Sequence, residues 1–137
     1  MIAPFHLAIP VGNLSQAEDF YGGLLGCNKG RQSDHWTDWN FFGHQLVTHV
    51  TDKTTDKSFN SVDGKHVPVP HFGVVLPMTV WQKLADRLSA ENVDFVVEPH
   101  VRFKGQTGEQ ATMFFYDPFG NALEFKAFAD ITALFKV

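Results

Sequence analysis

The chain of 137 residues repeats one order of sequence elements, and this duplication restricts its fold more than any other feature. A strand-like run at residues 4–11 is followed by apolar residues at helical spacing over residues 17–25. A second strand-like run at residues 69–77 is followed by the same spacing over residues 81–88. Each half then continues into aromatic-rich, strand-like sequence. The order β-α-β-β-β is therefore predicted twice.

Both predicted helices have recognisable ends. The pairs Ser15 with Glu18 and Thr79 with Gln82 have capping-box spacing at the helix starts. Gly26 and Asn92 are the expected stops, because both residue types tolerate a left-handed backbone. The apolar faces of the two helices are expected to be buried, and they consist of Ala17, Phe20, Tyr21, Leu24 and Leu25 in the first and Trp81, Leu84, Ala85 and Leu88 in the second.

Neither half has enough strands to bury its own sheet face, so the two halves are expected to combine. The predicted fold class is α+β, with two βαβββ modules at about 1–60 and 66–128 forming a curved mixed sheet or half-barrel. The helices lie outside, and a cleft lies between the modules. The length fits a single domain over residues 1–137. Residues 51–66 are nearly all polar and are predicted to be a mobile connection, with a lid as the alternative.

Composition excludes several classes of function. Lys and Arg number 11 against 15 Asp and Glu, which gives a net charge of −4 and argues against a nucleic-acid partner. The single cysteine, Cys27, excludes an internal disulfide and a zinc site of several thiolates, and it favours a reducing compartment. No basic leader and no membrane-length apolar run occurs, so the protein is predicted to be soluble and cytoplasmic, without a membrane partner.

Three side chains are predicted to face the cleft. Side chains alternate along a strand, which sets His6 opposite the branched residues of the first strand and His71 in the matching position of the second half. Glu124 follows a turn at residues 117–121 and points away from the apolar face of the last strand. An ionised carboxylate there is costly without a partner, and a divalent cation would satisfy it.

The first half lacks a counterpart of this carboxylate. Aligning Gly43 with Gly120 places Val47 at the position equivalent to Glu124. The predicted site therefore has two imidazoles, one carboxylate and open positions. This donor set suits Fe(II) first, with Mn(II) or catalytic Zn(II) as the alternatives.

The sequence resembles the vicinal oxygen chelate superfamily, which includes glyoxalase I, extradiol dioxygenases, fosfomycin-resistance enzymes and bleomycin-binding proteins. The resemblance covers nearly the whole chain and depends on residues 5–9, 20–26, 70–74 and 115–125 together. It implies paired βαβββ modules, frequent homodimers, and a metal held by His6, His71 and Glu124. The likeness is greatest to small proteins described as predicted extradiol-type dioxygenases.

The resemblance also narrows the activity. Glyoxalase I usually has a fourth protein ligand where Val47 stands, and bleomycin-binding members generally lack the ligands, so both functions are disfavoured. The preferred hypothesis is an Fe(II)-dependent oxygenase of extradiol type acting on a small catechol-like substrate. Tyr116 and His49 are its candidate acid or base residues, and His100 and Arg102 are further candidates, Arg102 for a substrate carboxylate.

Two alternatives stay open. One is a Mn(II)-dependent thiol or epoxide transferase of the fosfomycin-resistance type, which would need a thiol cosubstrate and no oxygen. The other is a module that binds an aromatic ligand without turnover. Oxygen dependence separates the two enzymes, and binding that a chelator does not affect would indicate the third function.

Overall fold

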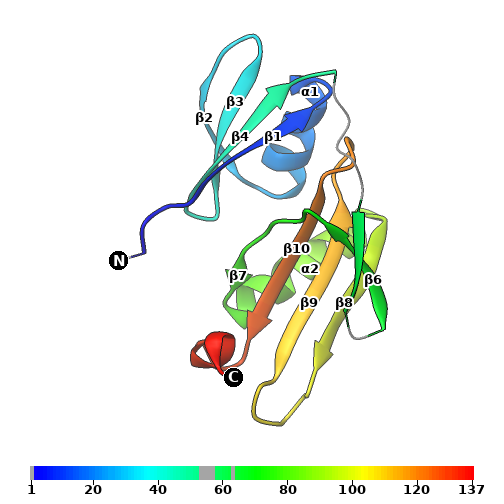
Figure 1. Cartoon of the computed structure of the whole chain (residues 1–137). Helices are drawn as coiled ribbons and strands as arrows, with labels where there is room; N and C mark the ends of the chain where they lie inside the picture. Colours follow the sequence, from blue (N-terminus) through cyan, green and yellow to red (C-terminus); the bar gives the residue numbers. More distant parts are fainter. Residues whose placement is uncertain (1, 53–57, 63) are drawn as a thin grey trace. The chain divides into compact units, whose positions relative to one another are not determined.

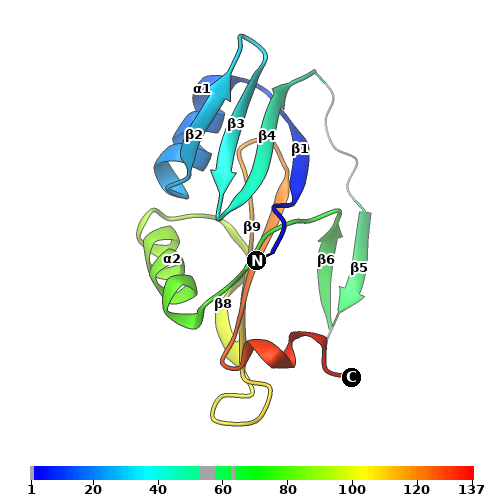
Figure 2. The ribbon, with the colours of Figure 1, turned by 90° about the vertical axis from the view of Figure 1, so that its left-hand side faces the viewer.

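The computed structural model describes residues 2–52, 58–62 and 64–137, and it divides into two compact units. Unit 1 comprises Met1–Asp56 and Asp117–Asn121, and unit 2 comprises Lys57–Tyr116 and Ala122–Val137. The described residues form two four-stranded sheets and one two-stranded hairpin (Figure 1 and Figure 2). The predicted α+β class with two βαβββ modules is confirmed, and the strands of each module form a sheet of their own.

Unit 1 contains the first module. Its sheet has the strand order β1-β4-β3-β2, with β1 parallel to β4 and the other neighbours antiparallel. The helical segment begins as α1 and continues as a π-helical segment, η1. The elements are β1 (His6–Val11), α1 (Leu14–Ala17), η1 (Glu18–Leu24), β2 (Asn28–Gln32), β3 (Trp36–Phe41) and β4 (His44–Val50).

The start of the first helix differs from the prediction. Asn13 is the cap, and its side-chain oxygen accepts a hydrogen bond of 2.8 Å from the Gln16 amide. The capping box at Ser15 is wrong, because the helix already begins at Leu14 and Ser15 lies within its first turn. Gly26 has φ +73° and ends the segment as predicted. The apolar face is buried, with Leu24 only partly so.

Unit 2 contains the second module and the hairpin. Its four-stranded sheet has the order β7-β10-β9-β8, so it repeats the strand order of unit 1. β7 is parallel to β10, and the other neighbours are antiparallel. The elements are β5 (Ser58–Val62), β6 (Lys65–Val69), β7 (Val75–Leu76), α2 (Met78–Ala90), β8 (Phe95–Arg102), β9 (Gln110–Tyr116), β10 (Ala122–Phe128) and the 3-10 helix η2 (Ile131–Phe135).

The helix α2 covers one face of the second sheet. Its predicted apolar residues are all buried, and the Trp81 indole donates a 2.9 Å hydrogen bond to the carbonyl of Phe125 on β10. Asn92 has φ +54° after the helix end, as predicted. The capping box at Thr79 is wrong, because the helix begins at Met78 and Pro77 precedes it without a side-chain cap. Leu123, Phe125 and Ala127 are buried, as predicted for the apolar face of β10.

The connection predicted at residues 51–66 contains an unpredicted hairpin. β5 pairs with β6 in an antiparallel register from Ser58↔Val69 to Val62↔Lys65, and residues 53–57 and 63 lie outside the described residues. The apolar residues of β5, Phe59 and Val62, are three positions apart, so its sequence lacks the alternation that would have indicated a strand. Every residue of β5 is exposed. On β6, Val67 is buried against Val97 and Phe114.

The strand predicted at residues 69–77 is much shorter than expected. Val69 belongs to β6, Phe72 makes a single parallel bridge to Leu123, and only β7 forms a regular strand. Prolines 70 and 77 have no amide hydrogen to donate, which limits strand pairing here. The aromatic-rich sequence predicted to form strands in each half does so, since residues 36–50 contain β3 and β4 and residues 110–128 contain β9 and β10. Residues 104–109 lie in the connection between β8 and β9. In the described residues, no helix is long and apolar enough to cross a membrane.

Candidate metal centre

In unit 2, His71 and Glu124 form an ion-pair contact. Nε2 of His71 lies 3.2 Å from Oε2 of Glu124. The backbone sets this contact, because the Glu124 amide donates to the Phe72 carbonyl at 2.8 Å and holds the histidine segment alongside β10. Gly73 makes the approach possible, since a Cβ at this position would overlap the backbone carbonyl oxygen of Glu124.

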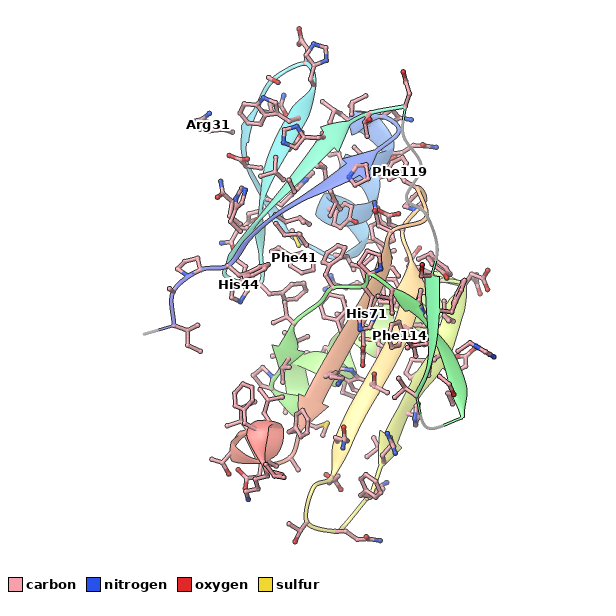
Figure 3. All side chains as sticks on the ribbon, viewed as in Figure 1. Arg31, Phe41, His44, His71, Phe114 and Phe119 are labelled. Carbon is pink, nitrogen blue, oxygen red and sulfur yellow. The ribbon has the colours of Figure 1, made fainter. Side chains whose placement is uncertain are left out.

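The imidazole of His71 is fixed in orientation. Its Nδ1 lies 2.6 Å from the carbonyl oxygen of Pro68, and a carbonyl only accepts, so Nδ1 carries the proton. The ring packs edge-on against Phe114 with centroids 4.8 Å apart, and Figure 3 shows the two rings next to each other. Nε2 is therefore the nitrogen that faces the carboxylate oxygen of Glu124. A second proton or a cation would satisfy both atoms.

The other carboxylate oxygen of Glu124 has partners on the same sheet face. Thr112 on β9 donates its hydroxyl to Oε1 at 2.9 Å, and Nζ of Lys126 lies 3.7 Å from the same atom. The Glu124 side chain is 12% exposed, and that of His71 is 31% exposed. Oε1 is thus held by Thr112, whereas Oε2 faces Nε2 of His71. This arrangement fits a cation ligand.

In unit 1, His6 repeats this pattern. It begins β1, and its Nδ1 lies 2.8 Å from Oε1 of Gln45, its cross-strand neighbour on β4. Because the amide oxygen only accepts, Nδ1 is the donor in this contact, and Nε2 is the nitrogen left to bind a ligand. His6 thus belongs to unit 1, and His71 with Glu124 belongs to unit 2. Within each unit, no three described His, Cys, Asp or Glu side chains form a metal-ligating group.

The strand registers show which positions of the two modules are equivalent. Leu7 pairs with Leu46 in the first module, and Phe72 bridges Leu123 in the second. One residue further along, Val47 is the counterpart of Glu124, as the alignment of the glycine turns predicted. Val47 is buried, so the position equivalent to Glu124 in the first module holds an apolar side chain.

The two predicted acid or base residues lie at different places. Tyr116 pairs with Ala122, two residues along the ladder from the Phe114–Glu124 pair, so it shares the sheet face of Glu124. His49 is exposed on β4, four residues beyond Gln45, which is about 13 Å along the strand from the row of His6. The roles of both stay predictions.

Three neighbours of the predicted ligands were not identified from the sequence. They are Gln45, Thr112 and Lys126. Lys126 was open to prediction, because it follows Glu124 by two residues and alternation puts both on one face. Gln45 and Thr112 depend on which strands pair and in which register, and a single sequence does not give this information.

The thiol of Cys27 is unsuited to nucleophilic attack. Cys27 is buried, and burial raises the pKa of the thiol from 9.0 to about 12. Near pH 7 the thiol is therefore protonated, whereas the thiolate is the nucleophile.

Comparisons with known proteins identify the family. The chain matches the Glyoxalase/Bleomycin resistance protein/Dioxygenase superfamily over residues 3–125. A glyoxalase/bleomycin resistance protein/dioxygenase from Alicyclobacillus acidocaldarius is 32% identical, with TM-score 0.78 and coverage of 97% of this chain and 96% of that one. The chain belongs to this superfamily. The predicted resemblance is therefore confirmed at the level of the superfamily.

More distant structures share the fold. The fosfomycin resistance protein FosX from Listeria monocytogenes is 17% identical, with TM-score 0.67 and coverage of 93% of this chain and 94% of that one. A lactoylglutathione lyase from Agrobacterium tumefaciens is 16% identical, with TM-score 0.62 and coverage of 91% and 92%. No curated protein sequence is found that matches this chain. The superfamily contains many enzymes, and its members typically bind a divalent metal.

Proposed function

We propose that this superfamily member is a metal-dependent oxygenase of extradiol type, acting on a small catechol-like or other vicinal-oxygen substrate. His6, His71 and Glu124 would hold a divalent metal, with Fe(II) as the first choice and Mn(II) or Zn(II) as alternatives. One observation supports this most strongly. Both histidines place Nδ1 on a carbonyl oxygen, and Nε2 of His71 lies 3.2 Å from a carboxylate oxygen of Glu124.

The chemistry of the donors fits such a metal. Two neutral imidazole nitrogens and one carboxylate are the ligands of non-haem Fe(II) sites that keep open positions. Hydrogen bonds from the far nitrogen of each ring to an oxygen fix the tautomer that a metal requires. The apolar Val47 leaves the site with three protein ligands instead of four. A bound metal would supply charge stabilisation and a place for two substrate oxygens to chelate.

The protein groups around the pair have separate tasks in this proposal. Thr112 holds Oε1 of Glu124 and so keeps Oε2 directed at His71. Phe114 is buried beside His71 and shields one side of the ring from water. Tyr116 shares the face of Glu124, and its phenol is our first candidate for giving or taking a substrate proton. His49 is the second candidate.

Location and assembly are part of the proposal. The single buried thiol suits a reducing cytoplasm. Members of the superfamily are often dimers, and we expect a homodimer here. A small molecule is the expected substrate.

Oxygen consumption tests the proposed activity. Protein purified without oxygen and loaded with Fe(II) should consume oxygen when catechol is added, and Glu124→Gln should abolish this. Gln106→Glu, a change of one charge in the loop between β8 and β9, is the control and should keep full activity. Turnover of fosfomycin with a thiol and Mn(II), without oxygen, would replace the proposal with the transferase. Chelator-resistant aromatic binding without turnover would indicate a binding module.

A further inference from the structure

We propose that Lys126 binds an anionic group of the substrate, so that the substrate is a vicinal-oxygen compound that also carries a carboxylate or a comparable anion. The proposal depends on the proposed function, because it assigns a substrate class to the same site. It differs from the sequence prediction, which gave a substrate carboxylate to Arg102.

The position of Lys126 connects it to the metal pair. Lys126 lies two residues after Glu124 on β10, so both side chains leave the sheet on the face opposite α2. Nζ of Lys126 is 3.7 Å from Oε1 of Glu124. The Lys126 side chain is 42% exposed, which leaves the ammonium open to a ligand.

The contact with Glu124 leaves N–H donors of the Lys126 ammonium available to a ligand. A distance of 3.7 Å is longer than a hydrogen bond, whereas the Thr112 hydroxyl reaches the same oxygen at 2.9 Å. Lys126 has three N–H donors, so it is free to turn toward an anion that binds beside Glu124.

Charge balance indicates the sign of the ligand. With a divalent metal bound, the metal, Lys126 and Glu124 together have a net charge of about +2, because the metal outweighs the one carboxylate. An ammonium 3.7 Å from the Glu124 carboxylate would be repelled by a cation held there unless a ligand brought negative charge. A vicinal-oxygen compound that carries a second anionic group would supply this negative charge.

The side chains next to Lys126 on the same sheet face are also polar or basic. Lys126 pairs with Thr112, which pairs with His100 on β8, and the next row places Arg102 beside Gln110. The same face therefore presents an ammonium, a hydroxyl, an imidazole and a guanidinium in adjacent rows. Such a surface favours an acidic ligand over a neutral one.

Binding titrations test the proposal on metal-loaded protein. Catechol is the neutral probe, and 2,3- and 3,4-dihydroxybenzoate carry a carboxylate beside the diol or further from it. Affinities are measured by calorimetry without oxygen, together with the bound metal. At least one dihydroxybenzoate should bind more tightly than catechol, and Lys126→Met should weaken it by about 10- to 100-fold while catechol changes little.

Two further variants separate anion binding from a structural role. Lys126→Arg should restore much of the preference for the dihydroxybenzoate, because it restores the positive charge. Lys83→Met removes the same charge from the exposed side of α2 and should change nothing. If Lys126 only balances Glu124, Lys126→Met would alter stability or metal affinity and leave the ratio of the two affinities as it was.

The two proposals fail in different ways. Full metal with an unchanged affinity ratio in Lys126→Met would overturn the anion assignment and leave the oxygenase proposal standing. The anion assignment would also be overturned if neither dihydroxybenzoate bound more tightly than catechol. Absent metal, or absent oxygen uptake in the wild type, would instead count against the proposed function.

Discussion

The two modules share one register but hold different chemistry. In each, the opening segment runs parallel to the last strand, through the Leu7–Leu46 pair in the first and the Phe72–Leu123 bridge in the second. The histidine of the first module contacts a neutral amide, Gln45, and that of the second contacts the Glu124 carboxylate, whose counterpart in the first module is the apolar Val47. Duplication thus preserved the scaffold, and single positions on matching strands came to differ in function.

The same comparison explains one glycine. Ala8 follows His6 by two residues, and Gly73 follows His71 by two residues, so they are equivalent. Ala8 lies in a regular strand that accommodates its Cβ. At Gly73 the backbone of β10 approaches so closely that a Cβ has no space. The second module therefore needs glycine where the first does not.

The largest expected effect comes from breaking this difference. Gly73→Ala should lower the free energy of unfolding by about 3 to 5 kcal/mol, because the added methyl overlaps the Glu124 carbonyl and backbone must move. Urea unfolding measures this free energy. The opposite substitution at the equivalent position, Ala8→Gly, should lower the free energy of unfolding by only about 0.5 to 1 kcal/mol. Equal losses of unfolding free energy in the two variants would show that the modules do not differ in the space available at these positions.

The second prediction concerns the partner that orients His6. Gln45→Leu removes the oxygen that holds Nδ1, so metal affinity should fall by about 10- to 100-fold. Metal titration measures this, with Gln32→Leu at the exposed end of β2 as the control. His71 has no such variant, because its partner is the main-chain carbonyl of Pro68. An unchanged metal affinity in Gln45→Leu would indicate that His6 does not bind the metal.

The third prediction compares the anchors of the two helical segments. The Tyr21 hydroxyl donates to buried Asp117 at 2.7 Å, and the Trp81 indole donates to the Phe125 carbonyl. Tyr21→Phe should cost about 1 to 3 kcal/mol, since it removes a donor from a buried carboxylate. Asn121 still donates to Asp117 in this variant, which limits the loss. Thermal unfolding measures it, and a loss near zero would mean that Asp117 does not need the phenol.

The smallest expected effect depends on pH. Burial raises the pKa of Cys27 from 9.0 to about 12, so above pH 9 the unfolded chain releases this proton while the folded chain keeps it. Stability should therefore fall with rising pH, by about 1.4 kcal/mol between pH 8 and 10. Cys27→Ala should lack this part of the loss. Parallel pH dependences of the variant and the wild type in urea unfolding would contradict the assignment.

The sequence predicted the duplicated modules because apolar spacing is a local signal. The buried face of α2 and the stops at Gly26 and Asn92 follow from residues close together in the chain. The side of β10 on which Glu124 lies also follows, because strand alternation has a fixed period of two.

The rest depended on contacts between distant segments. The hairpin β5–β6 is stabilised by Val67 against the Val97–Phe114 pair, while β5 itself is exposed and has no apolar pattern. Asn13 caps the first helix, but Ser15 nearby is also a suitable capping residue, so the sequence alone did not distinguish them. The support of His6 by Gln45 comes from a strand pairing 39 residues apart, which propensity and spacing do not specify.

Metal content tests the central claim most directly. Wild type, Glu124→Gln and Glu124→Val should be purified without oxygen, incubated with Fe(II), Mn(II) or Zn(II), desalted and analysed for bound metal. Glu124→Val makes the second module match Val47 of the first. We predict close to one metal per chain in the wild type and a loss of at least about 100-fold in affinity in both variants. A wild type that retains none of the three metals, or variants that bind as well as the wild type, would contradict the account.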